Sequence, residues 1–375
     1  MKKINNVLLI ISLIPLLTGC WDRLPLRTLK LMDVAGLDLN ESNKANLYYV
    51  DTKLKNSGQG SGEVKMGLTT LKGSSLLSAI GRGGYSNRVF YGVSTRVYLL
   101  SEKFAKEYPV SNLSFMLNAP YGAVDVPVVI FEGNLQKYLK DEVEKKEDFT
   151  KDLNDYIFTM ESRKMIPSTS MMDIILSKRD KMEDLAIPVI KQSDNALELS
   201  GAYLYRQGVN TGVKLSKDQL TMMMMLLGKH FVRLNLTGDF LEKNKEKQLA
   251  NQENKSEYAY AIKEIDSKTT VSKKSKGLPN VVIRVNLKIN SYVIGTETIK
   301  FKKSNIHKME KMLSKQMEGL AKSTIETLQK ANCDVIGVGK EMKAYYSNEW
   351  KSVNWRKDYP QLSIHPKFEV QIINE

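Results

Sequence analysis

Cysteine and histidine are scarce in this sequence of 375 residues, which holds two cysteines and three histidines. Two cysteines cannot build a disulfide framework, so that class of secreted fold is excluded. Cys333 is best interpreted as a small core residue. His230, His307 and His365 have no metal-ligating neighbour at helical or zinc-finger spacing. A catalytic arrangement that assembles only in space stays open, but nothing local supports one. We therefore expect no catalytic residue, no metal site and no cofactor site.

Long apolar stretches are missing after the first twenty residues, so no later segment predicts a membrane helix. The N-terminus carries Lys2 and Lys3 and then an apolar run over residues 7–17. That run is shorter than the roughly 20 residues of a membrane helix, and Pro15 interrupts it. A positive start, a short apolar core and small residues after it predict a secretory signal peptide over residues 1–19.

The signal peptide ends on Leu17-Thr18-Gly19-Cys20, which resembles the lipobox of bacterial lipoproteins. In that motif cleavage follows the glycine. The Cys20 sulfur takes a diacylglyceryl group as a thioether, cleavage leaves Cys20 as the first residue, and its amino group takes an N-acyl chain, with palmitate among the acyl groups. Several chains anchor a protein stably, at about 0.8 kcal/mol per buried CH₂. We expect Cys20 to hold the chain at the outer face of a membrane through a tether over residues 20–28. The alternative is a secreted protein with a coincidental cysteine.

Positive charge is concentrated in the C-terminal half of the sequence. Residues 21–196 hold 24 Lys and Arg against 23 Asp and Glu, a net charge of +1. Residues 197–375 hold 30 against 19, a net charge of +11. Such asymmetry is typical of contact with nucleic acid, lipid or an acidic partner. An exported protein rarely meets nucleic acid, so anionic lipid or an acidic partner surface is the favoured interpretation. Lysines that only keep the surface soluble explain the counts as well.

The length, with 42% hydrophobic and 26% charged residues, is typical of a globular chain of two or three domains. We divide it into an N-terminal α/β region over residues 29–196, which could contain two subdomains, and a C-terminal α+β region over residues 197–375. Pro188 and the polar run that follows it suggest this boundary.

The N-terminal region alternates predicted strands with predicted helices, as α/β and α+β folds do. Strands are predicted over residues 29–39, 46–54, 88–100 and 124–131, with Pro127 at an edge or a bulge. Residues 57–62 predict a loop. Helices are predicted over residues 74–80, 135–161 and 171–179, and a further helix is predicted to begin after Ser101 as its cap.

The C-terminal region predicts a twisted sheet with a long helix across it. Residues 281–290 alternate apolar and polar side chains, which predicts a half-buried antiparallel strand. Residues 305–331 place apolar side chains at helical spacing, which predicts a long amphipathic helix. Residues 362–372 predict a final strand, with Pro366 at an edge. The predicted fold class is therefore α+β and multi-domain, with mixed and antiparallel sheets.

Three stretches contain residue types that could indicate a chemical function. Residues 81–84 read GRGG, which lacks the spacing of a phosphate-binding loop. Residues 141–148 read DEVEKKED, a mixture of charges that predicts a solvated helix face. Met222 to Met225 point around a helix predicted over residues 217–229, so core packing is favoured over metal binding. No enzyme signature is found, and an anchored binding or assembly protein remains.

One C-terminal stretch resembles a known family signature. Residues 331–360 read ANCDVIGVGKEMKAYYSNEWKSVNWRKDYP. The pattern of the Ger(x)C family is a helix leading into Asp-Ile-x-Gly-x-Gly, a further helical stretch, a Trp-Lys pair, a second Trp and a Phe/Tyr-Pro step. The residues that fall in those places are Asp334, Gly337, Gly339, Trp350, Lys351, Trp355, Tyr359 and Pro360. The start is also similar to the family, because Cys20 is followed by Trp21, Asp22 and Arg23.

Physical roles can be assigned to four of these residues. Gly337 and Gly339 follow a helix and suit a turn with unusual backbone angles. Trp350 and Trp355 are five residues apart, so they do not share one helical face. We expect both to be buried, one in a helix and one in the turn after it.

The resemblance implies a non-enzymatic, lipid-anchored subunit of a bacterial spore germinant receptor. It would lie on the outer face of the spore inner membrane and assemble with two integral-membrane partners, the A and B subunits. That receptor senses nutrients and triggers germination. The alternative is a solute-binding lipoprotein of a transporter, which would have two similar α/β lobes and a tight small-molecule site.

Overall fold

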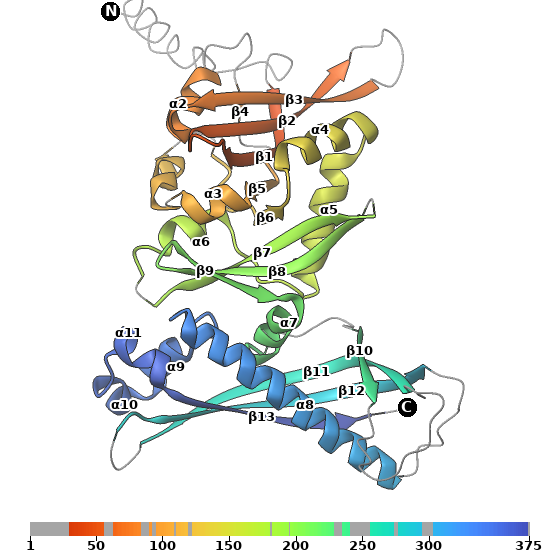
Figure 1. Cartoon of the computed structure of the whole chain (residues 1–375), viewed down its shortest axis with the longest axis vertical. Coiled ribbons are helices and arrows are strands. Elements are labelled where there is room, and N and C mark those ends of the chain that lie inside the picture. The colour runs from red at the N-terminus through yellow and green to blue at the C-terminus, as the bar shows by residue number, and fades with distance from the viewer. Residues whose placement is uncertain are drawn as a thin grey trace, which may run out of the picture.

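A computed structural model of the chain shows a mixed α and β protein with two sheets (Figure 1). The described residues are 30–55, 63–83, 90–91, 95–108, 110–118, 122–180, 182–194, 196–228, 235–240, 256–273, 277–294 and 303–373. The predicted signal peptide, Cys20, the tether, the predicted loop at 57–62 and His230 lie outside these residues. Within the described ranges, no helix has both the length and the apolar character that crossing a membrane requires.

Nine strands form the N-terminal sheet. In spatial order they are β3 (Glu63–Gly73), β2 (Ala45–Lys55), β1 (Lys30–Leu39), β5 (Val97–Ser101), β6 (Val128–Glu132), β7 (Asp184–Ser193), β8 (Ala196–Arg206) and β9 (Val209–Ser216), and the short β4 (Phe90–Tyr91) pairs with β1. The pairs from β1 through β5 and β6 to β7 are parallel, and the outer pairs are antiparallel. The central β5 and β6 are buried almost throughout, because helices cover both faces of the sheet.

Each face of the N-terminal sheet has its own helices. One face packs against α4 (Leu135–Lys145) and α5 (Phe149–Ser162). The other face packs against α2 (Leu76–Gly83), α3 (Glu102–Glu107), a 3₁₀ segment (Val110–Asn118) and α6 (Met171–Leu176). Local sequence sets the helix starts: the side chains of Ser101, Asn134 and Ser170 accept backbone N–H bonds at the first turns of α3, α4 and α6. The predicted Ser101 cap is confirmed.

Four strands form the C-terminal sheet, in the spatial order β10 (Asn235–Phe240), β11 (Ser256–Ser272), β12 (Asn280–Ile294) and β13 (Ser363–Ile372). The first three are antiparallel, and β12 is parallel to β13. A parallel pair needs a crossover connection. Here it contains α8 (Lys303–Lys330), α9 (Val338–Tyr345), α10 (Ser347–Lys351), α11 (Trp355–Asp358) and a 3₁₀ turn (Tyr359–Gln361).

The long helix α8 closes the exposed edge of β13. The backbone N–H of Phe368 donates to Glu318 Oε1 at 3.1 Å, that of Val370 to Ser314 Oγ at 3.3 Å and that of Ile372 to Glu310 Oε1 at 3.0 Å. The donors at every second residue of β13 match the acceptors at every fourth residue of α8, because two residues of a strand span about 6.7 Å and four residues of a helix about 6 Å. A free strand edge is a template for unwanted pairing, and these side chains occupy it.

A short helix, α7 (Lys217–Leu226), lies between the two sheets (Figure 1). It contacts β8 and β9 on one side and α8, β11 and β12 on the others. All four methionines from Met222 to Met225 are therefore buried, each no more than 2% exposed. Core packing, predicted for them from the sequence, is confirmed, and the core is continuous from one sheet to the other.

The α+β, multi-domain fold class is confirmed, and several local predictions are corrected. Within the strand predicted over residues 88–100, the described residues 95 and 96 are not part of a strand, while residues 90–91 form β4 and residues 97–100 belong to β5. Pro127 directly precedes β6, which is a central strand of the sheet and not an edge strand. Pro188 lies inside β7, where it is tolerated because β6 pairs with β7 only from Val189 onward. Glu142, predicted to be solvated, is 4% exposed.

The division of the chain at residues 196 and 197 stays a prediction. That point falls at the start of β8, which pairs with β7 in the N-terminal sheet.

Candidate functional site

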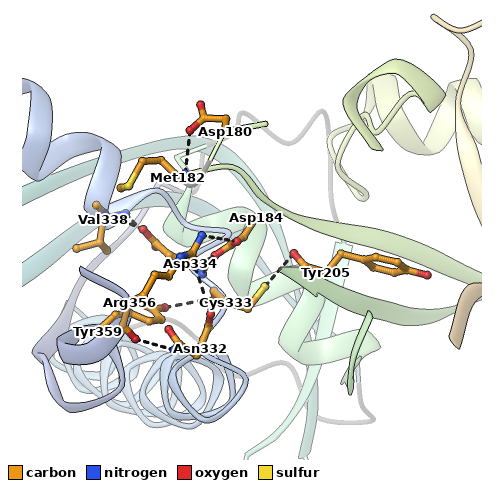
Figure 2. A network of polar contacts seen from close by, with 11 residues as sticks. Asp180, Met182, Asp184, Tyr205, Asn332, Cys333, Asp334, Val338, Arg356 and Tyr359 are labelled. Atoms are coloured by element: carbon orange, nitrogen blue, oxygen red, sulfur yellow. Dashed lines mark hydrogen bonds and ion pairs between the residues drawn. The ribbon is translucent and has the colours of Figure 1, made fainter. Parts of the chain in front are cut away.

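Several residues of the stretch 331–360 lie where the C-terminal crossover meets the N-terminal sheet (Figure 2). We call this place the junction and define it by six residues: Asp184, Asn332, Cys333, Asp334, Arg356 and Tyr359. Asp184 is the first residue of β7, whereas the other five come from the segment between α8 and β13. Polar contacts at the junction therefore tie together parts of the chain that are 150 residues or more apart.

An ion pair between Asp184 and Arg356 is the centre of the junction. Arg356 donates from Nη1 to Asp184 Oδ2 at 2.7 Å and from Nη2 to Asp184 Oδ1 at 2.8 Å. The Asp184 side chain is 0% exposed and that of Arg356 is 25% exposed. The backbone N–H of Asp334 also donates to Asp184 Oδ2, at 2.7 Å. Parallel charge-assisted bonds of this kind fix both distance and orientation.

Asp334 caps the first turn of α9. Its Oδ1 accepts from the N–H of Val338 at 3.0 Å and its Oδ2 from the N–H of Gly339 at 2.7 Å. Burial raises the pKa of Asp334 to about 7, and the charge of Asp184 adds to this shift, while the two N–H bonds oppose it. The positive charge of Arg356 also opposes the shift of the Asp334 pKa.

The two signature glycines have different roles. Gly337 has φ +75°, a left-handed conformation that suits glycine, and it starts α9. Gly339 is helical instead, and a Cβ there would come within 2.5 Å of a ring carbon of Trp355 and of Cε of Met182. The turn predicted for Gly337 is confirmed. The prediction for Gly339 is wrong, because what it needs is space for close packing.

The two signature tryptophans pack together. Trp350 lies in α10 and Trp355 begins α11, and their ring centroids are 5.7 Å apart. Trp355 also packs on Tyr359, with the centroids 5.0 Å apart. Trp355 is 6% exposed, so its predicted burial is confirmed, whereas Trp350 is only partly buried.

Cys333 is a buried structural residue. It is 0% exposed, and its Sγ lies 3.4 Å from the carbonyl oxygen of Tyr205 in β8. Burial raises the pKa of its thiol well above the ordinary value, and the charges of Asp184 and Asp334 add to the effect. The reactive thiolate is therefore disfavoured. The core role predicted for Cys333 is confirmed.

The junction can hold two parts of the protein in a fixed relation. A peripheral ion pair, Lys340 with Glu183 at 3.2 Å, lies beside it. Across the described ranges, no group of three His, Cys, Asp or Glu side chains could hold a metal ion. His307 and His365 are exposed and lie on different elements.

Sequence reasoning missed Asp184 and Arg356. Arg356 lies inside the signature, next to Trp355, and could have been flagged there. Asp184 lies in a strand whose sequence carries no local signal for it.

Comparisons with known proteins agree on one family. A family model described as "Spore germination protein N-terminal domain" matches residues 22–192, and one described as "Spore germination B3/GerAC like, C-terminal" matches residues 200–375. Spore germination protein KC of Bacillus subtilis (strain 168) is 22% identical over 414 residues, which cover 99% of this chain and 95% of that protein. The crystal structure of the GerBC protein is similar with a TM-score of 0.59 at 16% identity, over 91% of this chain and 97% of that one. At that identity the likeness shows the fold.

Proposed function

The chain belongs to the GerAC-like family of spore germination proteins, and from this premise we propose that it is the lipid-anchored subunit of a spore germinant receptor. The observation that carries the proposal is that the two models of this family follow one another along almost the whole chain. Membership of the family also confirms the expectation that the chain is not an enzyme.

The proposed anchor is Cys20, with a diacylglyceryl thioether and an N-acyl chain after cleavage behind Gly19. Cys20 lies ten positions before Lys30, the first residue of β1, with nine residues between them. An extended segment of that length spans at most about 35 Å. In this proposal the N-terminal sheet is therefore held close to the outer face of the spore inner membrane.

The proposed partners are the integral-membrane A and B subunits of the receptor. The anchor raises the local concentration of the protein beside them, so that weak contacts become sufficient. The junction supports an assembly role, because it presents the two sheets to a partner in one fixed relation. In this proposal residues 29–196 and 197–375 are the two structural regions that assemble.

The alternative, a solute-binding lipoprotein, fits the structure poorly. It requires two similar lobes, whereas the sheets have nine and four strands. A hollow of about 180 Å³ lies beside α4, α5 and the β7–β8 turn. Its buried acid, Glu142, already accepts from Gln192 at 3.0 Å and pairs with Lys146 at 2.8 Å.

Co-purification tests the proposal. Tagged wild-type protein and Cys20→Ala are each produced in sporulating cells, and the proteins recovered from detergent-solubilised spore membranes are identified by mass spectrometry. We expect A- and B-type membrane subunits with the wild type and fewer of them with Cys20→Ala. Recovery of a transporter permease, or of no membrane protein, would refute the receptor assignment.

A further inference from the structure

The solvent side of α8 carries a stripe of unpaired positive charge. We define the lysine stripe as Lys308, Lys311, Lys315 and Lys322. All four are exposed. Their spacings of three, four and seven residues keep them within an arc of about 60°, at 3.6 residues per turn. Over the described part of the chain, none of the four lies within 4 Å of a carboxylate.

The stripe is positive partly because Glu318, three residues after Lys315 and four before Lys322, is used elsewhere. Glu310 and Glu318 turn toward β13 and accept N–H bonds from Ile372 and Phe368. In an ordinary exposed helix, glutamates three or four residues from lysines would neutralise them. On α8 only Glu326, four residues beyond Lys322, remains near the stripe.

Solubility alone does not explain this arrangement. Lys308, Lys311 and Lys315 follow one another at spacings of three and four residues. Like charges at such spacings repel one another and destabilise a helix. A soluble surface is obtained equally well with interspersed charges of both signs, which avoid this repulsion. The stripe therefore has a small energetic penalty that contact with an anionic surface would remove.

We infer that the lysine stripe docks an acidic face of a partner protein in the receptor, an inference that rests on the proposed function. The stripe spans 14 residues of helix, or about 21 Å. It fits a row of carboxylates of similar length, such as one side of an acidic helix. The apolar side of α8 is already buried against the C-terminal sheet, whereas the stripe is exposed.

A protein partner is favoured over a lipid surface because of where α8 lies. β1 to β3 are at one end of the molecule, and α8 with the C-terminal sheet is at the other (Figure 1). The proposed anchor precedes β1 by ten residues, so the membrane it inserts into is at the end away from the stripe. Complementary charge then sets the orientation and rate of docking.

Charge reversal with a matched control tests the inference. The stripe variant replaces Lys308, Lys311, Lys315 and Lys322 with Glu. The control variant makes the same change at four exposed lysines of α4 and α5, which are Lys137, Lys140, Lys145 and Lys151. Both are compared with the wild type by co-purification from spore membranes at increasing salt, after circular dichroism and thermal melting have confirmed folding. A third variant with Gln at the stripe removes the charge without reversing it.

We expect the stripe variant to lower recovery of membrane subunits by about tenfold or more, the Gln variant to lie between, and the control to change it less than about twofold. Wild-type recovery should fall as salt rises past 0.1 M, where the screening length is about 10 Å. Equal recovery of the wild type and the stripe variant overturns the inference and leaves the proposed function standing.

A cross-link identifies the partner independently. Lys315→p-benzoylphenylalanine is irradiated in intact spore membranes, and the product is analysed by mass spectrometry. A product with a peptide rich in Asp and Glu from a membrane protein supports the inference. A product with lipid alone, with a second copy of this chain, or with nothing overturns it. If wild-type protein recovers no A- or B-type subunit, the proposed function fails. The cross-link still shows whether the lysine stripe contacts an acidic protein surface.

Discussion

Breaking the Asp184–Arg356 pair at the junction should destabilise the protein strongly, and in a way that a second substitution relieves. Arg356→Met keeps much of the side-chain volume but leaves the Asp184 carboxylate, which is 0% exposed, without its cation. Removing one partner of a buried pair typically costs about 3–5 kcal/mol, because the remaining charge is buried and uncompensated. We expect Arg356→Met to fall in that range at pH 8.

The reciprocal change should cost less. Asp184→Asn keeps an oxygen that can accept the N–H of Asp334, and it leaves a guanidinium that is 25% exposed and can reach water. Loss of these bonds should cost about 1–3 kcal/mol. The double variant has no uncompensated charge, so its free energy of unfolding should exceed the additive expectation by about 2 kcal/mol.

Urea unfolding of the four proteins at pH 8 measures this coupling. Circular dichroism reports the whole fold, and the fluorescence of Trp350 and Trp355 reports the junction. An additive cycle, within about 0.5 kcal/mol, would show that the pair is not an energetic unit. A cost for Arg356→Met below about 1 kcal/mol would refute the claim that Asp184 is desolvated.

Substitutions at the signature glycines, at Asp334 and at Glu318 test other parts of the structure. Gly339→Ala should destabilise by about 2 kcal/mol or more, because its Cβ would meet the Trp355 ring at 2.5 Å. Gly337→Ala, where φ is +75° but space is open, should cost only about 1 kcal/mol, so equal thermal shifts would contradict the packing argument. The pKa of Asp334, raised to about 7, means that the folded state binds more protons than the unfolded state between pH 4 and 7. The free energy of unfolding should therefore fall across that window and level off above it. Asp334→Asn should remove this pH dependence of the free energy of unfolding. If urea unfolding gives parallel pH profiles for the wild type and Asp334→Asn, the assignment to Asp334 is refuted. Glu318→Leu should cost about 1–3 kcal/mol by leaving the N–H of a strand edge without its acceptor, whereas Glu318→Gln should cost little. Equal melting temperatures for the two would show that the edge is solvated.

Long periodic segments were predictable from the sequence, and short or tertiary-dependent ones were not. β12 alternates buried and exposed residues from Val281 to Ile289, and α8 keeps its apolar stripe over 28 residues. Both patterns are long enough to be unambiguous. The place of Pro188 inside β7 could not be predicted, because whether a proline fits a strand depends on which neighbour needs its N–H.

The junction was only half predictable. Asp334, Gly337 and Trp355 could be flagged from the resemblance to a family signature, since they follow one another in one segment. Asp184 could not, because it is 150 residues away from Asp334 and its role exists only once β7 reaches the crossover. The same holds for Glu310 and Glu318, which in the sequence are ordinary polar positions of a helix. Their role as acceptors depends on the place of β13.

The edge of β13 shows how closely helix and strand match. The next residue before Phe368 in the strand series is Pro366, which has no N–H to donate, and the next residue after Glu318 in the helix series is Lys322, which has no acceptor to offer. The hydrogen-bond series therefore ends on both elements at the same step. Because Lys322 has no bond to make at the strand, it is free to join the lysine stripe. One helix thus protects a strand edge with its acids and presents its lysines outward. Beyond its last turn the chain runs directly into Cys333 and Asp334, so the junction holds the base of α8 in a fixed relation to the N-terminal sheet.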